Sequence, residues 1–172
     1  MPVYKEGLKG VIIPTVTSVI AAIKHYEQQG GTANIFVNDD GMQLVQEDQA
    51  AARKAFYELN HIGWCSRPGQ NVNVPKDDPK YFERKGQFKK ASNMNYCLDF
   101  SLRVEEEFQK RLESYCLQRG VNQQDLSIEE ENEIYDQARN AVVEQDNGKT
   151  KAAGNCRIGE IILIIDSDTR VV

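Results

Sequence analysis

Two pairs of aspartates follow short apolar segments of the chain. Asp39 and Asp40 end the segment "IFVNDD", and Asp166 and Asp168 follow "IILII". If both segments are strands of one parallel sheet, their carboxyl ends meet at the edge where open α/β folds bind ligands. Four carboxylates there repel one another unless a cation or hydrogen-bond donors offset their charge, and their oxygens suit Mg²⁺ or Mn²⁺, which bridge to phosphates. The pattern predicts a metal–nucleotide site; aspartates that only end strands and cap helices are the alternative.

A second group of polar residues lies in the segment "KKASNMN". Lys90, Ser92, Asn93 and Asn95 fall in what reads as the first turns of a helix. Helix N-termini carry partial positive charge, and lysines beside them strengthen the attraction for anions. The segment therefore predicts an anion site, and a capped helix with solvent-exposed lysines is the alternative.

The elements that must position these residues follow from hydrophobic periodicity and from turn residues. We expect helices at 15–29, at 47–62, from about 89 through at least 104, and at 127–142. We expect strands within 33–41, 63–68 and 160–165, and loops at 67–80 and 146–155. Short apolar strands that alternate with helices indicate an α/β fold. The sheet should be mostly parallel, with helices on both faces.

Helical spacing also predicts which side chains face the core. Thr15 is expected to cap the first helix, and Ser127 with Glu130 forms a capping-box pattern before the last one. The expected inward residues are Val16, Val19, Ile20, Ile23 and Tyr26, then Ala51, Ala55, Phe56 and Leu59, then Met94, Leu98, Leu102 and Phe108, and finally Ile134, Tyr135, Ala138, Ala141 and Val142.

Composition narrows the class of protein. The 172 residues suffice for one domain, and the net charge of -5 argues against a general nucleic-acid binder. The longest apolar run, "IILII", has the length of a strand, and charged residues interrupt the N-terminus, so neither a membrane span nor a signal peptide is expected. Four widely spaced cysteines predict reduced, partly buried thiols.

Four segments, in order, resemble the motifs of family 2 glycosyltransferases, which have the GT-A fold. "MPVYKEG" resembles P-x-Y-N-E with Lys5 replacing Asn, and "VNDDG" resembles the D-D-G segment. "KKASNMNYCL" resembles K-A-G-x-L-N with Ser92 and Met94 replacing Gly and Leu. "GEIILIIDSDT" resembles the strand that ends in D-x-D. The amino-acid sequences of these segments are most similar to those of fungal cellulose-synthase-like members of the family.

The resemblance implies the nucleotide-binding half of a metal-dependent inverting enzyme that transfers a sugar from a nucleotide sugar, with a UDP-sugar as the expected donor. Asp39 and Asp40 would contact uracil and ribose, and Glu6 would line the nucleotide pocket. Lys90 and Asn95 would steady the diphosphate. Asp166 and Asp168 would hold Mn²⁺ or Mg²⁺, with Asp166 also contacting the nucleotide.

The resemblance covers roughly 1–104 and 156–172, so the chain reads as one partial domain, 1–172, incomplete at both ends. The acidic helical stretch at about 105–155 reads as an insertion, either a solvated decoration or a docking element. The general base and the saccharide-acceptor site would belong to a missing C-terminal half. The fragment itself is expected to be soluble, without membrane contact, while the parent would be an integral membrane protein with this domain facing the cytosol. A non-catalytic nucleotide-binding or interaction module, or an inactive fragment, is the alternative.

Overall fold

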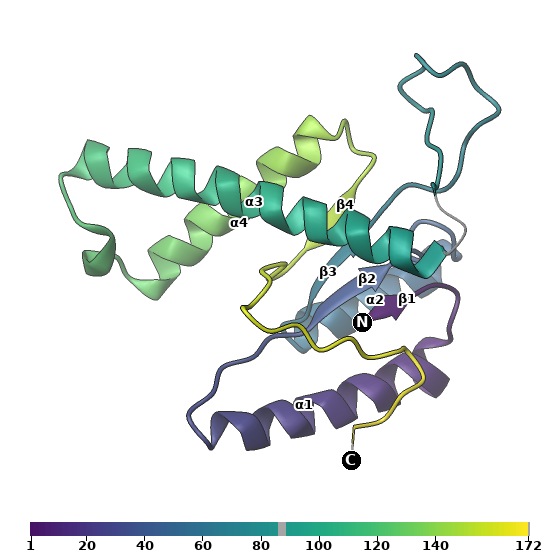
Figure 1. Ribbon diagram of the computed structural model, residues 1–172, viewed down its shortest axis with the longest axis horizontal. Helices are drawn as coiled ribbons and strands as arrows, with labels where there is room; N and C mark the ends of the chain where they lie inside the picture. The colour runs from purple at the N-terminus through teal and green to yellow at the C-terminus, as the bar shows by residue number, and fades with distance from the viewer. Residues whose placement is uncertain (86–88, 172) are drawn as a thin grey trace.

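A computed structural model describes residues 1–85 and 89–171. It contains a four-stranded sheet in the order β1-β2-β3-β4, with helices on both faces (Figure 1). The strands are β1 (Pro2–Val3), β2 (Phe36–Asp39), β3 (Gly63–Ser66) and β4 (Lys151–Ala153). The helices are α1 (Ile13–Glu27), continuous with a π-helical turn η1 (Leu8–Ile12), α2 (Glu47–Leu59), α3 (Lys89–Arg119), the 3₁₀ turn η2 (Gln123–Asp125) and α4 (Ile128–Gln145).

The α/β class is confirmed, and the sheet is open and mixed. β1, β2 and β3 are parallel, whereas β4 runs antiparallel to β3, with Trp64 opposite Ala153. β4 lies inside the stretch 146–155, for which the sequence predicted a loop. That prediction was wrong because the stretch has turn residues at both ends and only three residues, Lys151–Ala153, that pair with β3.

Consecutive strand residues point to opposite faces of the sheet, and each face has its own core. Val37 and Trp64 belong to the core beneath α1 and α2, which also contains Tyr57. Cys65 belongs to the core beneath α3 and α4, against which Phe36 packs. The three parallel strands are therefore covered on both sides, as apolar strands of this kind require.

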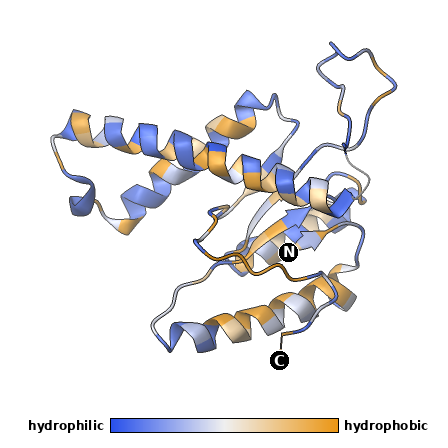
Figure 2. Ribbon diagram, viewed as in Figure 1, coloured by the Kyte–Doolittle hydropathy of each residue, from blue (hydrophilic) through white to orange (hydrophobic). Residues whose placement is uncertain are grey.

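The strand predicted at 160–165 does not form. Its apolar residues run as an irregular chain in front of the sheet (Figure 2), and Ile161 is 89% exposed. The segment is held downstream instead, where the Thr15 hydroxyl donates to the Ser167 carbonyl at 2.6 Å and the Val171 amide donates to the Ser18 hydroxyl at 3.1 Å. A strand needs a neighbouring strand, and in the described part of the chain none pairs with this segment.

The predicted inward faces are confirmed only in part. In α1, Val16 is buried but Tyr26 is 51% exposed, and in α3, Phe108 is buried but Leu102 is 62% exposed. α2 buries Arg53 and Tyr57, while Leu59 is exposed. The buried face of α3 consists of Asn93, Cys97, Phe100, Ser101, Val104, Phe108 and Leu112. The prediction failed because both buried faces include polar residues, which a search for apolar residues at helical spacing excludes.

Of the two predicted helix caps, one forms and one does not. Thr15 is not an N-cap, because α1 continues from η1 without a break and Thr15 lies inside it. Ser127 and Glu130 do form the expected capping box before α4. α3 runs past residue 104 to Arg119 and packs along α4, so the acidic stretch at 105–155 contributes both this helical hairpin and β4.

The segment Leu8–Glu27 is long and apolar enough to cross a membrane, judged by length and composition alone. This differs from the expectation that no membrane span occurs, because that expectation rests on uninterrupted apolar runs, whereas this segment has a high mean hydropathy although polar residues interrupt it. About 17% of the segment is buried within the fold, and it lies near the N-terminus. Core helices of soluble proteins and signal sequences share these properties.

We predict that Leu163→Ala changes the free energy of unfolding by less than about 0.5 kcal/mol, because this side chain is 74% exposed. The matched substitution Val37→Ala, in fully buried β2, should cost about 2 kcal/mol or more. Denaturant unfolding of both variants measures the difference. A cost at Leu163 equal to that at Val37 would mean that 160–165 packs into the core.

The cysteines give a second prediction. Cys65, Cys97 and Cys156 are buried free thiols, whereas Cys116 is partly exposed. Burial raises the pKa of the Cys156 thiol to about 12, so this thiol stays neutral and unreactive near pH 8. Alkylation of the folded chain at pH 8 should modify Cys116 alone, and the other three only after denaturation. Rapid alkylation of all four in the native state would contradict the packing of this core.

Candidate functional site

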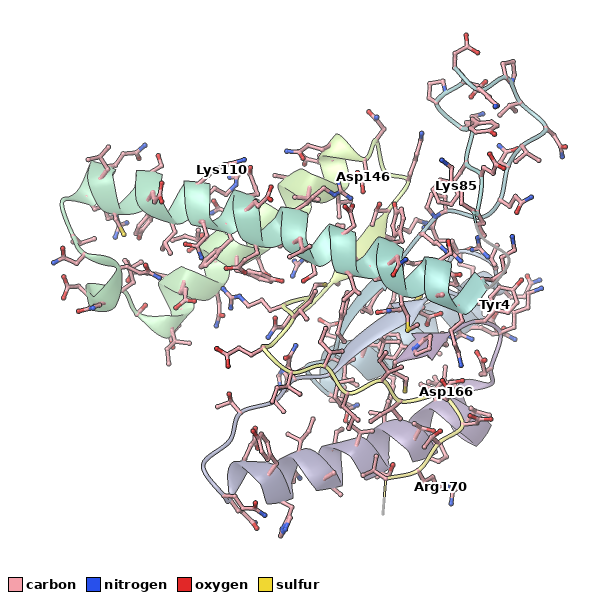
Figure 3. The ribbon with its side chains drawn as sticks, in the orientation of Figure 1. Tyr4, Lys85, Lys110, Asp146, Asp166 and Arg170 are labelled. Carbon is pink, nitrogen blue, oxygen red and sulfur yellow. The ribbon has the colours of Figure 1, made fainter. Side chains whose placement is uncertain are left out.

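A cavity of about 720 Å³ lies where β1 and β2 end. Its wall is built by the residues around Tyr4, the end of β2 with the turn after it, two residues of the loop after β3, the start of α3, and the chain around Asp166 (Figure 3). Its lining residues are Pro2, Val3, Tyr4, Glu6, Asp40, Leu44, Gln70, Arg84, Lys89, Lys90, Asn93, Asp166, Ser167 and Asp168. This is the carboxyl edge of the parallel strands, where the sequence predicted the site.

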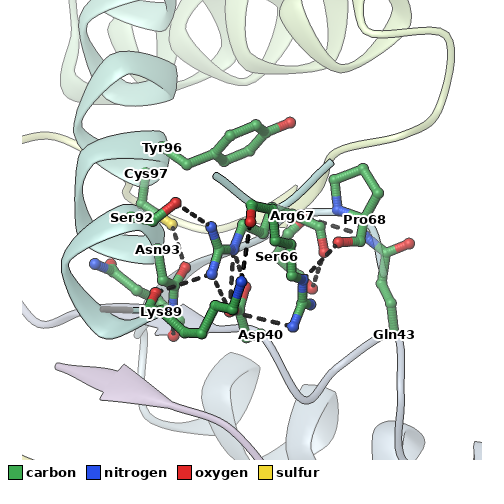
Figure 4. Close-up of polar contacts among 12 residues, drawn as sticks. Asp40, Gln43, Ser66, Arg67, Pro68, Lys89, Ser92, Asn93, Tyr96 and Cys97 are labelled. Atoms are coloured by element: carbon green, nitrogen blue, oxygen red, sulfur yellow. Dashed lines mark hydrogen bonds and ion pairs between the residues drawn. The ribbon is translucent and has the colours of Figure 1, made fainter. Parts of the chain in front are cut away.

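Asp40 forms part of the cavity wall and is held by Arg67. The Arg67 guanidinium donates to Oδ1 at 2.8 Å from Nε and to Oδ2 at 2.8 Å from Nη2 (Figure 4). The same guanidinium donates to the Ser92 hydroxyl and to the Lys89 carbonyl, both in the first turn of α3. A fully buried arginine thus ties the end of β2 to the start of α3.

Asp39 lies beneath the cavity rather than in its wall. It accepts hydrogen bonds from Arg53 Nη1 at 2.6 Å and from the Tyr57 hydroxyl at 2.8 Å, both on α2. Burial raises the pKa of Asp39, and the Arg53 charge and the Tyr57 hydrogen bond act in the opposite direction. The pKa of Tyr57 is raised by its burial and by the neighbouring Asp39 carboxylate.

Arg53 also holds the segment after β1. Its guanidinium donates to the Tyr4 carbonyl at 3.1 Å and to the Glu6 carbonyl at 2.7 Å. Gly41 allows this close crossing, because a Cβ there would lie 1.5 Å from the Tyr4 carbonyl oxygen. Asp39, Asp40 and Gly41 therefore all have structural roles, and Asp40 also lines the cavity.

Lys90 and Asp166 form an ion pair across the cavity mouth. The Nζ and Oδ1 atoms are 2.5 Å apart, and the side chains are 52% and 49% exposed. Exposed pairs of this kind contribute at most about 1 kcal/mol, so a ligand or an ion can compete for either partner. Asp168 and Ser167 line the cavity beside them.

Six of the predicted site residues line this cavity: Glu6, Asp40, Lys90, Asn93, Asp166 and Asp168. Asp39 does not line it, and neither does Asn95, which is exposed. Asn93 lines the cavity instead and donates to the Asn38 carbonyl at 2.9 Å. Residues two apart on a helix point about 200° apart, so the two asparagines cannot share one face.

Sequence reasoning missed three cationic residues of the site, namely Arg67, Arg84 and Lys89. Arg67 directly follows β3, just as Asp40 follows β2, and strand-end position could have identified it. Arg84 and Lys89 belong to the basic cluster "RKGQFKK". Arg84 pairs with Asp40 and the Lys89 carbonyl accepts from Arg67, and both partners are remote in sequence.

The acid pair Asp166 and Asp168 fits a hard cation only with help from a ligand. In the described residues, no group of three or more histidine, cysteine or acidic side chains lies close enough to hold a metal. Mg²⁺ and Mn²⁺ are often held by one or two carboxylates together with substrate phosphates and water. The two aspartates supply that kind of oxygen donor at the cavity mouth.

Comparisons with protein-family models, with curated proteins and with solved structures found no match for this chain.

We predict that Asp39→Asn costs about 3–5 kcal/mol of unfolding free energy, because it leaves the Arg53 charge buried without its partner. The control Asp99→Asn removes an exposed carboxylate from Arg103, which keeps its second partner Asp146, and should cost less than about 1 kcal/mol. Denaturant unfolding of the two variants gives both values. Equal, small costs would show that Asp39 does not organise this edge of the sheet.

Proposed function

We propose that this chain is the nucleotide-sugar-binding part of a metal-dependent inverting glycosyltransferase of GT-A type. The enzyme would transfer a sugar, with a UDP-sugar as donor, to a saccharide acceptor. One observation carries the proposal: four segments that resemble the family's motifs, far apart in the sequence, contribute to one cavity at the carboxyl edge of the parallel strands.

The positions of the residues around the cavity suggest which part of the ligand each would contact. Asp40, Glu6 and Tyr4 form the side of the cavity next to β1 and β2, and we assign them to the nucleoside. Asp39 supports that side indirectly, because it holds Arg53, which in turn holds the Tyr4 and Glu6 carbonyls. Asn93, rather than Asn95, is the asparagine that lines the cavity, and its amide donates to the Asn38 carbonyl.

The part of the cavity formed by the start of α3 and by residues 166–168 suits the diphosphate and its cation. Lys90 would pair with phosphate oxygens, and Asp166 and Asp168 would hold Mn²⁺ or Mg²⁺. A bound cation stabilises the negative charge that develops on a leaving diphosphate. The chain's own residues bind and orient the donor, and a saccharide acceptor would be received by another part of the enzyme.

For location, we propose that α1 is a helix of the folded domain and that the parent enzyme is anchored in a membrane by other segments, with this domain on the cytosolic side. Ile12 and Val16 belong to the core beneath α1 and α2, and Thr15 is buried against the chain at Ser167. A helix held in this way packs as part of the fold.

A second function, a nucleotide-binding module without catalytic activity, is favoured by the ion pair at the cavity mouth. Lys90 neutralises Asp166 in the free chain, which leaves Asp168 as the unpaired acid of the motif in the described residues. Such a module would bind nucleotide without needing a metal ion.

We predict that UDP binds the purified chain and that Mn²⁺ strengthens this binding about tenfold or more. A chelator should abolish this gain because it removes the cation. The substitution Asp168→Asn should also abolish it, because the cation then loses a carboxylate oxygen. The control Asp99→Asn removes an exposed acid from the outer face of α3 and should change nothing. Calorimetric titration of each variant provides the measurement.

The outcomes separate the two functions. Binding of UDP that is equally tight with and without Mn²⁺ supports the metal-independent module and contradicts metal-dependent transfer. A folded, monomeric chain that binds no UDP at all contradicts both.

A further inference from the structure

Arg84 is the least satisfied cation near the cavity. Its side chain is only 8% exposed, and it forms part of the cavity wall. Nε donates to the Pro68 carbonyl at 3.1 Å, and Nη1 lies 3.7 Å from Asp40 Oδ2, which is an ion-pair distance rather than a hydrogen bond. Nη2 is buried and has no hydrogen-bond partner in the described residues.

An unsatisfied buried donor is costly, because folding removes its water without a replacement. Arginine has five donors in a rigid planar fork, and here one end of the fork is held while the other is empty. A fork held in this way is ready to receive an oxygen atom from the cavity side without first losing side-chain freedom.

Positive charges outnumber negative charges among Arg84 and the charged residues around it. Asp40 is the one carboxylate among its described ion-pair partners, and Arg67 already occupies both oxygens of that carboxylate. Two guanidinium groups therefore share one negative charge. Lys89 adds a further cation, and its Nζ donates to the Arg84 carbonyl at 3.1 Å.

Two of the other acids of the cavity have closer partners of their own, and the third, Asp168, forms no ion pair in the described residues. Asp166 pairs with Lys90 at 2.5 Å, and the Glu6 carboxylate accepts the Tyr4 amide at 2.5 Å. Neither makes a described contact with Arg84. The excess positive charge thus lies at Arg84 and Lys89, where Lys89 is the chain neighbour of Lys90 in the first turn of α3.

We propose that Arg84, assisted by Lys89, is an anion-binding residue that receives a phosphate oxygen of the ligand in this cavity. The chemistry recognised is a phosphate oxyanion, because a planar guanidinium fork matches it and a nearby ammonium strengthens the attraction. The identification of that phosphate as the diphosphate of a nucleotide rests on the proposed function; the anion site itself does not require a nucleoside.

The experiment compares three probes by calorimetry: inorganic diphosphate, UDP and uridine. In Arg84→Gln, binding of inorganic diphosphate and of UDP should weaken about tenfold or more, whereas uridine should bind as before. The control Arg111→Gln removes one positive charge from α3 at a partly exposed ion pair and should leave all three affinities unchanged. Circular dichroism establishes that each variant is folded.

If Arg84→Gln does not fold, Arg84→Lys replaces it as the test. Lysine keeps the charge but lacks the fork, so diphosphate affinity should fall about threefold to tenfold. Unchanged diphosphate affinity in a folded Arg84 variant overturns the proposal even where UDP binding stands. Diphosphate binding that depends on Arg84, in a chain that shows no preference for UDP, supports the anion site and contradicts the proposed function.

Discussion

Two adjacent buried carboxylates at the end of β2 organise this molecule. Asp39 and Asp40 point into different surroundings, and each is neutralised by its own arginine. Removing a charge from water costs several kcal/mol unless it is paired and hydrogen-bonded, so these two pairs decide which neighbouring segments must come close. Through Arg53 the first pair holds α2 and the chain after β1, and through Arg67 the second pair holds β3 and the start of α3.

This arrangement explains why the cavity forms at that edge and why its two sides differ. The side next to β1 is built on backbone carbonyls gathered by Arg53, whereas the side next to α3 carries an excess of cationic groups around Asp40. The chain at 166–168 completes the cavity although no strand leads into it. Its position depends on hydrogen bonds to α1 rather than on a sheet ladder.

The local features with strong short-range signals were predictable. β2, β3 and the capping box of α4 formed where the sequence predicted them, because an apolar run with flanking turn residues, or a Ser-x-x-Glu spacing, acts within a few residues. The buried faces of α2 and α3 were not predictable from apolar spacing. Arg53, Asn93 and Ser101 are buried because partners on other elements satisfy them, and those partners are remote in sequence.

The sequence alone determined the α/β class, the elements around β2 and β3, and the acidic and lysine-bearing segments near the site. Only the tertiary structure decided that Asp39 is structural while Asp40 borders the cavity, that Asn93 replaces Asn95, and that "IILII" remains outside the sheet. The physical reason is the same in each case. Local periodicity determines which way a side chain can point, but burial, charge pairing and strand neighbours come from residues tens of positions away.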